Sequence, residues 1–129
     1  MKKIILFASF MLLVSFYMEA QNQFRKDFNY AAFFDAETDT WSDWEQVEHT
    51  FVFNINDNQD IRHYTAKGEI IVYRNMGNKQ VGDTKDGEHY QILDLLDDTG
   101  NELQLKLFDN PEIGVLLINA PYMVQLAKY

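Results

Sequence analysis

The 129-residue chain contains no cysteine. This absence excludes disulfide bonds, a thiol nucleophile, a thiolate metal site and a lipid-modified cysteine anchor. Any folded domain must therefore be stabilised by its hydrophobic core alone. A chain of this length can bury enough apolar surface to do so.

Basic residues are scarce as well. The chain has 11 lysines and arginines against 20 aspartates and glutamates, a net charge of −9. Nucleic-acid binding requires clustered cations that neutralise phosphates, and beyond the first 20 residues only Arg25 and Lys26 are adjacent. We therefore expect no nucleic-acid partner. The negative field would instead attract a basic protein or a cation.

Enzyme motifs are missing too. Only one serine, Ser42, follows residue 20, and no G-x-S-x-G elbow surrounds it. Glycine-rich phosphate loops and the HExxH zinc motif are also absent. A carboxylate pair of the glycosidase kind stays open by count, and Glu69 and Asp94 are the two strand carboxylates to examine. We expect a protein that is not an enzyme and carries no cofactor.

The first stretch, MKKIILFASFMLLVSFYMEAQ, reads as an export signal. Lys2 and Lys3 precede 15 uncharged positions, which suits a signal peptide better than a spanning helix of about 20 residues. We predict a secretory signal peptide over residues 1–20, with a retained anchor as the alternative. A single domain over 21–129 would then be secreted or periplasmic, with no further membrane span. The missing disulfides favour a bacterial source.

Removal of the signal makes the protein more acidic. Lys2, Lys3 and Glu19 leave with it, so 11 basic and 20 acidic side chains become nine and 19, and the net charge becomes −10. A net charge this negative keeps an exported domain soluble and favours partners that carry positive charge.

Hydrophobic residues after position 20 recur every second residue, which is the period of a β-strand. The alternation is clear in EQVEHTFVFNIN (45–56) and ELQLKLF (102–108). We expect further strands at 60–65, 69–75, 89–96, 113–118 and 122–128, a first strand near FNYAAFFD after a loose tail at 21–30, and a long loop at 76–88. The pattern predicts an all-β fold, a small antiparallel meander of about 7–8 short strands that forms a barrel or a sandwich. Strands of six or seven residues with charged outward positions do not suit a transmembrane barrel.

Two histidines on successive strands could share a metal ion. If the loop 56–59 is even, residues 55 and 60 are opposite, and His49 and His63 then lie on different faces of the sheet. Only an odd loop would bring the two imidazoles together. We therefore expect no zinc site.

Calcium ligands are available in two turns. NINDNQD offers oxygens at Asn54, Asn56, Asn58 and Asp60, and DLLDDTGNE offers a second acidic set. Neither stretch matches an EF-hand loop. Asn, Asp and Gly are also what hairpin turns require, so the sequence favours turns over calcium sites.

Aromatic residues make up 15% of the chain and are the best candidates for ligand contacts. They can stack on a sugar or line a cavity, but they fill cores more often. We select Trp41, Trp44, Tyr64 and Tyr73 as candidate ligand-binding residues. The other aromatic residues that make the domain rich in rings are Phe33, Phe34, Phe51, Phe53 and Tyr90. Trp41 and Trp44 differ in parity, so on a strand one would enter the core and the other would be exposed.

The stretch TWSDWEQVEHTFVFNINDNQDIRHYT, with Tyr73 and DLLDDTGNELQLKLF, resembles small secreted all-β proteins of uncharacterised function common in Bacteroidota. The likeness covers residues 41–118, and MEAQ resembles the cleavage regions of signals from that phylum. The resemblance implies export and an all-β fold, and it implies no catalytic residues.

The expected function is therefore binding without catalysis. The ligand would be either a small molecule or glycan at an aromatic surface, or a protein partner along an acidic face or a sheet edge. Alternatively, the protein is a periplasmic inhibitor or immunity-type protein that binds a basic partner through an acidic face. A carboxylate-pair hydrolase is the third alternative.

Overall fold

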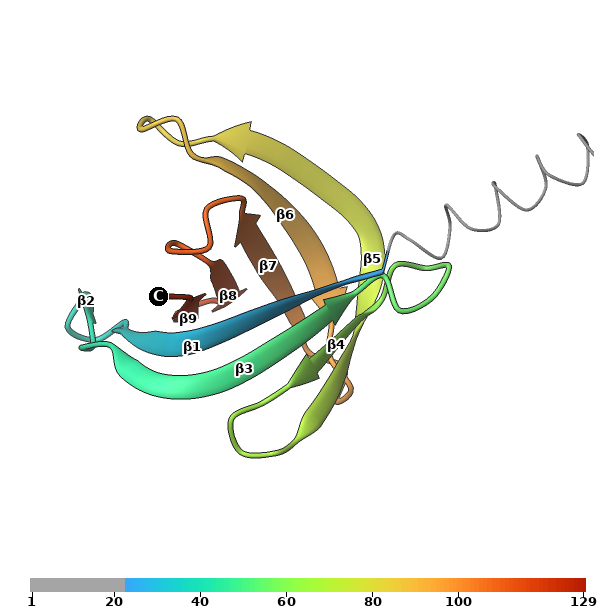
Figure 1. Cartoon of the computed structure of the whole chain (residues 1–129), viewed down its shortest axis with the longest axis horizontal. Coiled ribbons are helices and arrows are strands. Elements are labelled where there is room, and N and C mark those ends of the chain that lie inside the picture. The colour runs from blue at the N-terminus through green and yellow to red at the C-terminus, as the bar shows by residue number, and fades with distance from the viewer. Residues whose placement is uncertain (1–22) are drawn as a thin grey trace, which may run out of the picture.

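A computed structural model describes residues 23–129, which form antiparallel strands and no helix (Figure 1). The predicted signal peptide, residues 1–20, lies outside the described residues. The described part thus contains no helix with the length and apolarity needed to cross a membrane. The nine strands are β1 (Phe24–Asp35), β2 (Thr40–Trp41), β3 (Glu45–Phe53), β4 (Ile61–Tyr64), β5 (Ile70–Asp83), β6 (His89–Leu96), β7 (Glu102–Phe108), β8 (Val115–Asn119) and β9 (Tyr122–Ala127).

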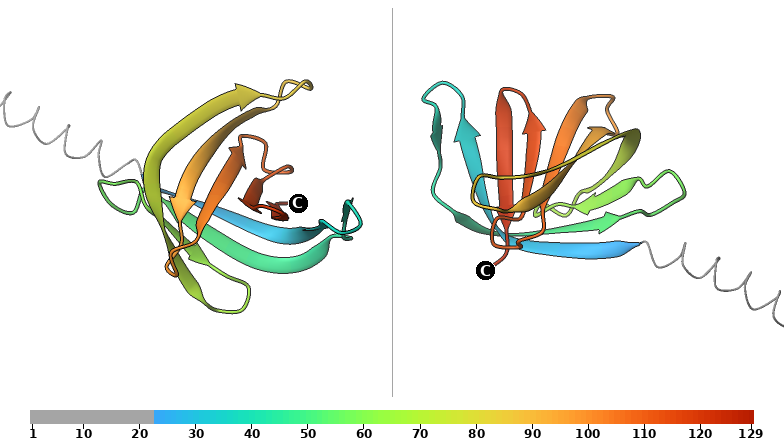
Figure 2. Two further views of the ribbon diagram at one scale, coloured as in Figure 1. Left: turned by 180° about the vertical axis from the view of Figure 1, so that it is seen from behind. Right: turned by 90° about the horizontal axis from the view of Figure 1, so that it is seen from above.

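The strands form a closed up-and-down barrel. From β3 onward each strand pairs with the next, β1 pairs with β3, and β9 pairs back onto β1, so eight strands close and β2 is an addition beside β1 (Figure 2). The all-β prediction and its barrel alternative are confirmed. The strands at 89–96 and 102–108 begin and end at the predicted residues, because their alternation is uninterrupted and turns flank both.

Two strands are much longer than the sequence predicts. β5 continues to Asp83 through most of the expected loop, with a register shift between Asn75 and Lys79 where Gly77 has a φ of 86°. A β-bulge at that glycine lets the strand bend and still pair with β6. β1 begins at Phe24, inside the expected tail.

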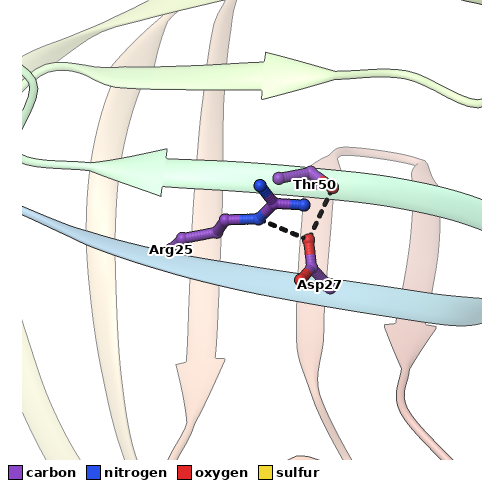
Figure 3. A network of polar contacts seen from close by, with 3 residues as sticks. All are labelled: Arg25, Asp27 and Thr50. Carbon is purple, nitrogen blue, oxygen red and sulfur yellow. Dashed lines mark hydrogen bonds and ion pairs between the residues drawn. The ribbon is translucent and has the colours of Figure 1, made fainter.

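The early start of β1 depends on its pairing with β3. Asp27 lies directly opposite Thr50, whose hydroxyl donates a 2.7 Å hydrogen bond to the Asp27 carboxylate (Figure 3). Arg25 donates a second bond of 2.9 Å to the same oxygen. The Thr50 bond first, and then Arg25, lower the pKa of Asp27. These side chains cross-link β1 and β3 on the outer face, a long-range contact that no local pattern predicts.

Apolar side chains fill the interior of the barrel. Alternate residues of each strand point inward, and where β1 meets β9 the small Ala31 lies opposite Leu126, both fully buried. An eight-stranded barrel is just wide enough for its own side chains. The largest fully buried side chains are Phe51, Ile61, Leu95, Leu105, Leu126 and Val115.

The antiparallel order places alternate connections at opposite ends of the barrel. The β1–β2 connection and the β8–β9 turn lie at one end, next to each other in the right panel of Figure 2. We call this end the β8–β9 end. The β7–β8 connection belongs to the opposite end.

Candidate functional site

Four aromatic residues line an open depression of about 580 Å³ at the β8–β9 end. We call this depression the rim groove. The β1–β2 connection forms one wall and the β8–β9 turn forms the other. Its lining residues are Phe33, Phe34, Asp35, Ala36, Glu37, Thr40, Trp41, Ser42, Pro121 and Tyr122.

The β1–β2 wall is held by local hydrogen bonds. Ser42 donates its backbone N–H to the Phe33 carbonyl at 2.8 Å, and the Phe33 N–H donates to the Ser42 hydroxyl at 2.9 Å. The Asp35 carboxylate accepts the N–H of Glu37 at 2.9 Å, which starts the turn. The register places Trp41 opposite Phe34, with ring centroids 5.3 Å apart. These contacts fix the conformation of the β1–β2 connection at the rim of the barrel.

The rings of the rim groove remain substantially exposed. The exposed fraction is 44% for Phe33, 42% for Trp41 and 69% for Tyr122. Phe33 lies opposite Val124, so it belongs to the inward face where the barrel ends and no further layer covers it. The groove therefore offers apolar ring surface to a ligand, with the exposed carboxylates of Asp35 and Glu37 beside it.

Trp44 lies in different surroundings. Its exposed fraction of 41% equals that of Trp41 within 1%, yet it packs edge-on against Tyr129 at 6.2 Å, and Tyr129 in turn meets Tyr30 at 5.3 Å. The Asn29 side-chain amide holds the Tyr129 backbone, since it donates to the Tyr129 carbonyl and accepts the Tyr129 N–H. The prediction that one tryptophan enters the core is wrong, because the chain leaves β2 at Trp41 and starts β3 only at Glu45, so strand parity does not relate the two residues.

The two candidate tyrosines, Tyr64 and Tyr73, lie in different environments. Tyr64 is 38% exposed on β4, away from the lining of the rim groove. Tyr73 is 4% exposed, and its hydroxyl is 2.8 Å from Nδ1 of His63. Of the four predicted ligand-binding residues, only Trp41 lines the rim groove.

The expectation that His49 and His63 point to opposite faces is wrong. Ile55 N–H does bond to the Asp60 carbonyl at 3.0 Å, as an even loop requires. Asn54, however, adopts a φ of 61° and adds one residue to the β3 side, so Phe53 and not Asn54 lies opposite Ile61. This bulge shifts the register by one and turns both imidazoles to the interior.

The two histidines and Tyr73 form a continuous polar chain. Nδ1 of His49 lies 2.9 Å from Nε2 of His63, whose Nδ1 reaches the Tyr73 hydroxyl. The His63 ring also stacks on Phe51 at a centroid distance of 4.1 Å. Among the described residues, no buried side-chain nitrogen or oxygen lacks a hydrogen-bond partner. These hydrogen bonds can all form when both imidazoles are neutral, because each ring then has one donor and one acceptor nitrogen.

Burial sets the charge of this polar chain. Desolvation first, and then the nearby His49, lower the pKa of His63 to about 3. Desolvation also lowers the pKa of His49. For Tyr73, burial and then Asp97 and Asp98 raise the pKa above its usual value. All three groups are therefore neutral near pH 7. The two histidines and Tyr73 form a hydrogen-bonded polar network within the core.

Metal ligands do not converge in the described part of the chain. Within residues 23–129, no three histidine, aspartate or glutamate side chains are grouped to hold a metal ion. In the turn at 54–60, the Asn56 side-chain oxygen accepts the N–H groups of Asn58 and Asp60. Asp60 accepts hydrogen bonds from Asn56 and from Asn75 N–H. These oxygens stabilise the turn, which accounts for their spacing without an ion.

A second depression, of about 410 Å³, also opens towards the β8–β9 end. Its lining includes Asp94, one of the two strand carboxylates selected from the sequence, and Glu102 from the neighbouring strand β7. Asp94 accepts a 3.1 Å hydrogen bond from Gln104. Glu69 does not line this depression, so the two carboxylates selected from the sequence do not form a pair there.

Sequence reasoning missed Tyr122, Asp35 and Glu37 as groove residues. Tyr122 follows a turn that is sequence-distant from Trp41, and only barrel closure through the β1–β9 pairing brings them together. The one local feature that could have indicated the groove is the β1–β2 hairpin, which is flanked by Phe34 and Trp41. The chain matches no family model, no curated protein and no solved structure.

Proposed function

We propose that this protein is a non-catalytic binding domain whose ligand docks in the rim groove. The observation that carries the proposal is the exposure of Phe33, Trp41 and Tyr122 around one depression of a barrel whose interior is already filled. Exposed rings gathered at a concave site are typical of ligand contacts, whereas isolated exposed rings are ordinary. A sugar face or an apolar ligand part can stack on them.

The absence of catalysis is supported by how the reactive groups are used. Ser42 donates its hydroxyl to the Asp43 carbonyl and accepts the Phe33 N–H, so it holds the groove wall. His63 is buried inside the barrel. Neither arrangement provides a nucleophile with a neighbouring base.

A second candidate function is the binding of a basic protein, as an inhibitor or immunity-type protein does. The observation that favours it is the pair of carboxylates, Asp35 and Glu37, in the groove lining. Export to the periplasm or the cell exterior remains a prediction from residues 1–20.

The proposal is tested with two tryptophan variants of residues 21–129. Calorimetric titration with soluble oligosaccharides and charged peptides should identify a ligand whose affinity falls about tenfold or more in Trp41→Ala. Trp44→Ala is the matched control, because Trp44 is equally exposed outside the groove. Loss of binding in Trp44→Ala alone would contradict the proposal. So would ligand turnover that Asp94→Asn or Glu102→Gln abolishes.

A further inference from the structure

The rim groove combines aromatic rings with negative charge. Its lining residues include four aromatic residues and the two acidic residues Asp35 and Glu37, and no lysine or arginine among the described residues lines it. A neutral sugar can donate hydrogen bonds to carboxylates, but it gains no attraction between net charges. A cation next to ring faces gains both from the ring quadrupole and from the carboxylates.

The surrounding chain extends the same charge. Between Lys26 and Arg62 the sequence has nine aspartates and glutamates and no lysine or arginine. Six of these acids, Asp35, Glu37, Asp39, Asp43, Glu45 and Glu48, lie between the end of β1 and the first half of β3. A cationic ligand would thus be attracted to the wall that carries Trp41, and the attraction would decrease with salt.

The carboxylates are available for such a ligand. Both Asp35 and Glu37 are exposed, and the acid–base side-chain contacts of the described part, Arg25–Asp27 and His89–Asp83, involve other acids. One Asp35 oxygen, Oδ1, accepts the Glu37 N–H. A carboxylate oxygen that already accepts one bond retains its charge and further acceptor capacity.

The openness of the site favours a side chain of a larger partner over a free small molecule. Small-molecule sites bury most of the ligand surface. Here Tyr122 remains 69% exposed, and the depression lies at a barrel rim. A protruding arginine could place its planar guanidinium on the rings and its N–H groups on the carboxylates.

We infer that the rim groove binds an arginine-bearing segment of a basic partner protein, with the guanidinium placed between the aromatic rings and the carboxylates of Asp35 and Glu37. This inference rests on the proposed function, since it names the ligand class of the same groove. It makes the basic-protein function the stronger of the two candidates.

The probe is a short arginine peptide, compared with the same peptide carrying citrulline, which keeps the shape and loses the charge. Residues 21–129 should bind the arginine peptide at least about tenfold more tightly than the citrulline peptide. Trp41→Ala should remove this preference. Glu37→Gln should weaken arginine-peptide binding about twofold to fivefold.

Glu112→Gln is the matched charge control. Glu112 is an exposed glutamate in the β7–β8 connection at the opposite end of the barrel, and the substitution changes the net charge by the same amount. It should leave the affinity unchanged. Equal weakening in Glu37→Gln and Glu112→Gln would mean diffuse attraction by the net charge and would overturn the inference.

The other outcomes separate the inference from the proposed function. Equal binding of both peptides, or binding of a neutral oligosaccharide alone, with loss in Trp41→Ala, would overturn the arginine inference and keep the groove as a binding site. No binding of either peptide or of the oligosaccharides would contradict both.

Discussion

Aromatic residues form two regions in this barrel that differ in nearly every physical respect. In the interior, Phe51 and Tyr73 are almost fully buried, and His63 lies between them with both nitrogens hydrogen-bonded. At the rim groove, Phe33 and Trp41 are more than two-fifths exposed. The same residue types thus serve packing in one place and offer contact surface in the other. The position along the barrel axis decides which, and composition does not.

The largest expected difference between the two regions is in stability. Phe51→Ala should lower the free energy of unfolding by about 3–5 kcal/mol, because it leaves a cavity in a filled interior. Trp41→Ala should lower it by less than about 1 kcal/mol, since the ring is partly solvated. Chemical denaturation of both variants measures this. Similar losses in the two variants would break the distinction.

Removal of the Tyr73 hydroxyl should have a smaller effect on the free energy of unfolding. Tyr73→Phe should destabilise the protein by about 1–3 kcal/mol, because Nδ1 of the buried His63 loses its partner. Tyr64→Phe, on an exposed tyrosine, should change the stability by no more than about 0.5 kcal/mol. If the two tyrosine variants were equally stable, the interior polar chain would contribute nothing to folding.

The interior should also make stability depend on pH. The pKa of His63 is about 3 in the folded state and 6.5 as its ordinary value, so the unfolded chain binds more protons between these values. Stability is then fully present above pH 6.5 and is lost as the pH falls. From pH 8 to pH 5 the loss should be about 2 kcal/mol. Denaturation midpoints across this range, with His89→Gln as the exposed-histidine control, measure the loss. A flat profile would contradict the burial of His63 as a neutral group.

Strands with uninterrupted alternation could be predicted from the sequence, whereas the register between strands could not. The uninterrupted alternation of β7 predicts its ends correctly. The bulge at Asn54 depends on one residue adopting a left-handed conformation, and this residue reversed the expected placement of His49 relative to His63. Nothing in the local pattern distinguishes it from the polar residues of the turn.

The candidate site was predictable only in part. Trp41 was selected for its residue type, and it lines the groove. Tyr73, selected on the same ground, lies in the core because of its position opposite Ile61. Barrel closure brings Tyr122 to Asp35 and Glu37, because it pairs residues of β1 and β9 that are about 90 positions apart in the sequence.

The two tryptophans allow the most direct test of the central claim, that the rim groove is the binding site. Each gives one indole N–H signal in a heteronuclear NMR spectrum of residues 21–129, and Trp41→Phe and Trp44→Phe assign the two signals. On titration with the arginine peptide, the Trp41 signal should shift and the Trp44 signal should stay in place. A shift of the Trp44 signal alone would contradict the account and place the ligand beside Tyr129.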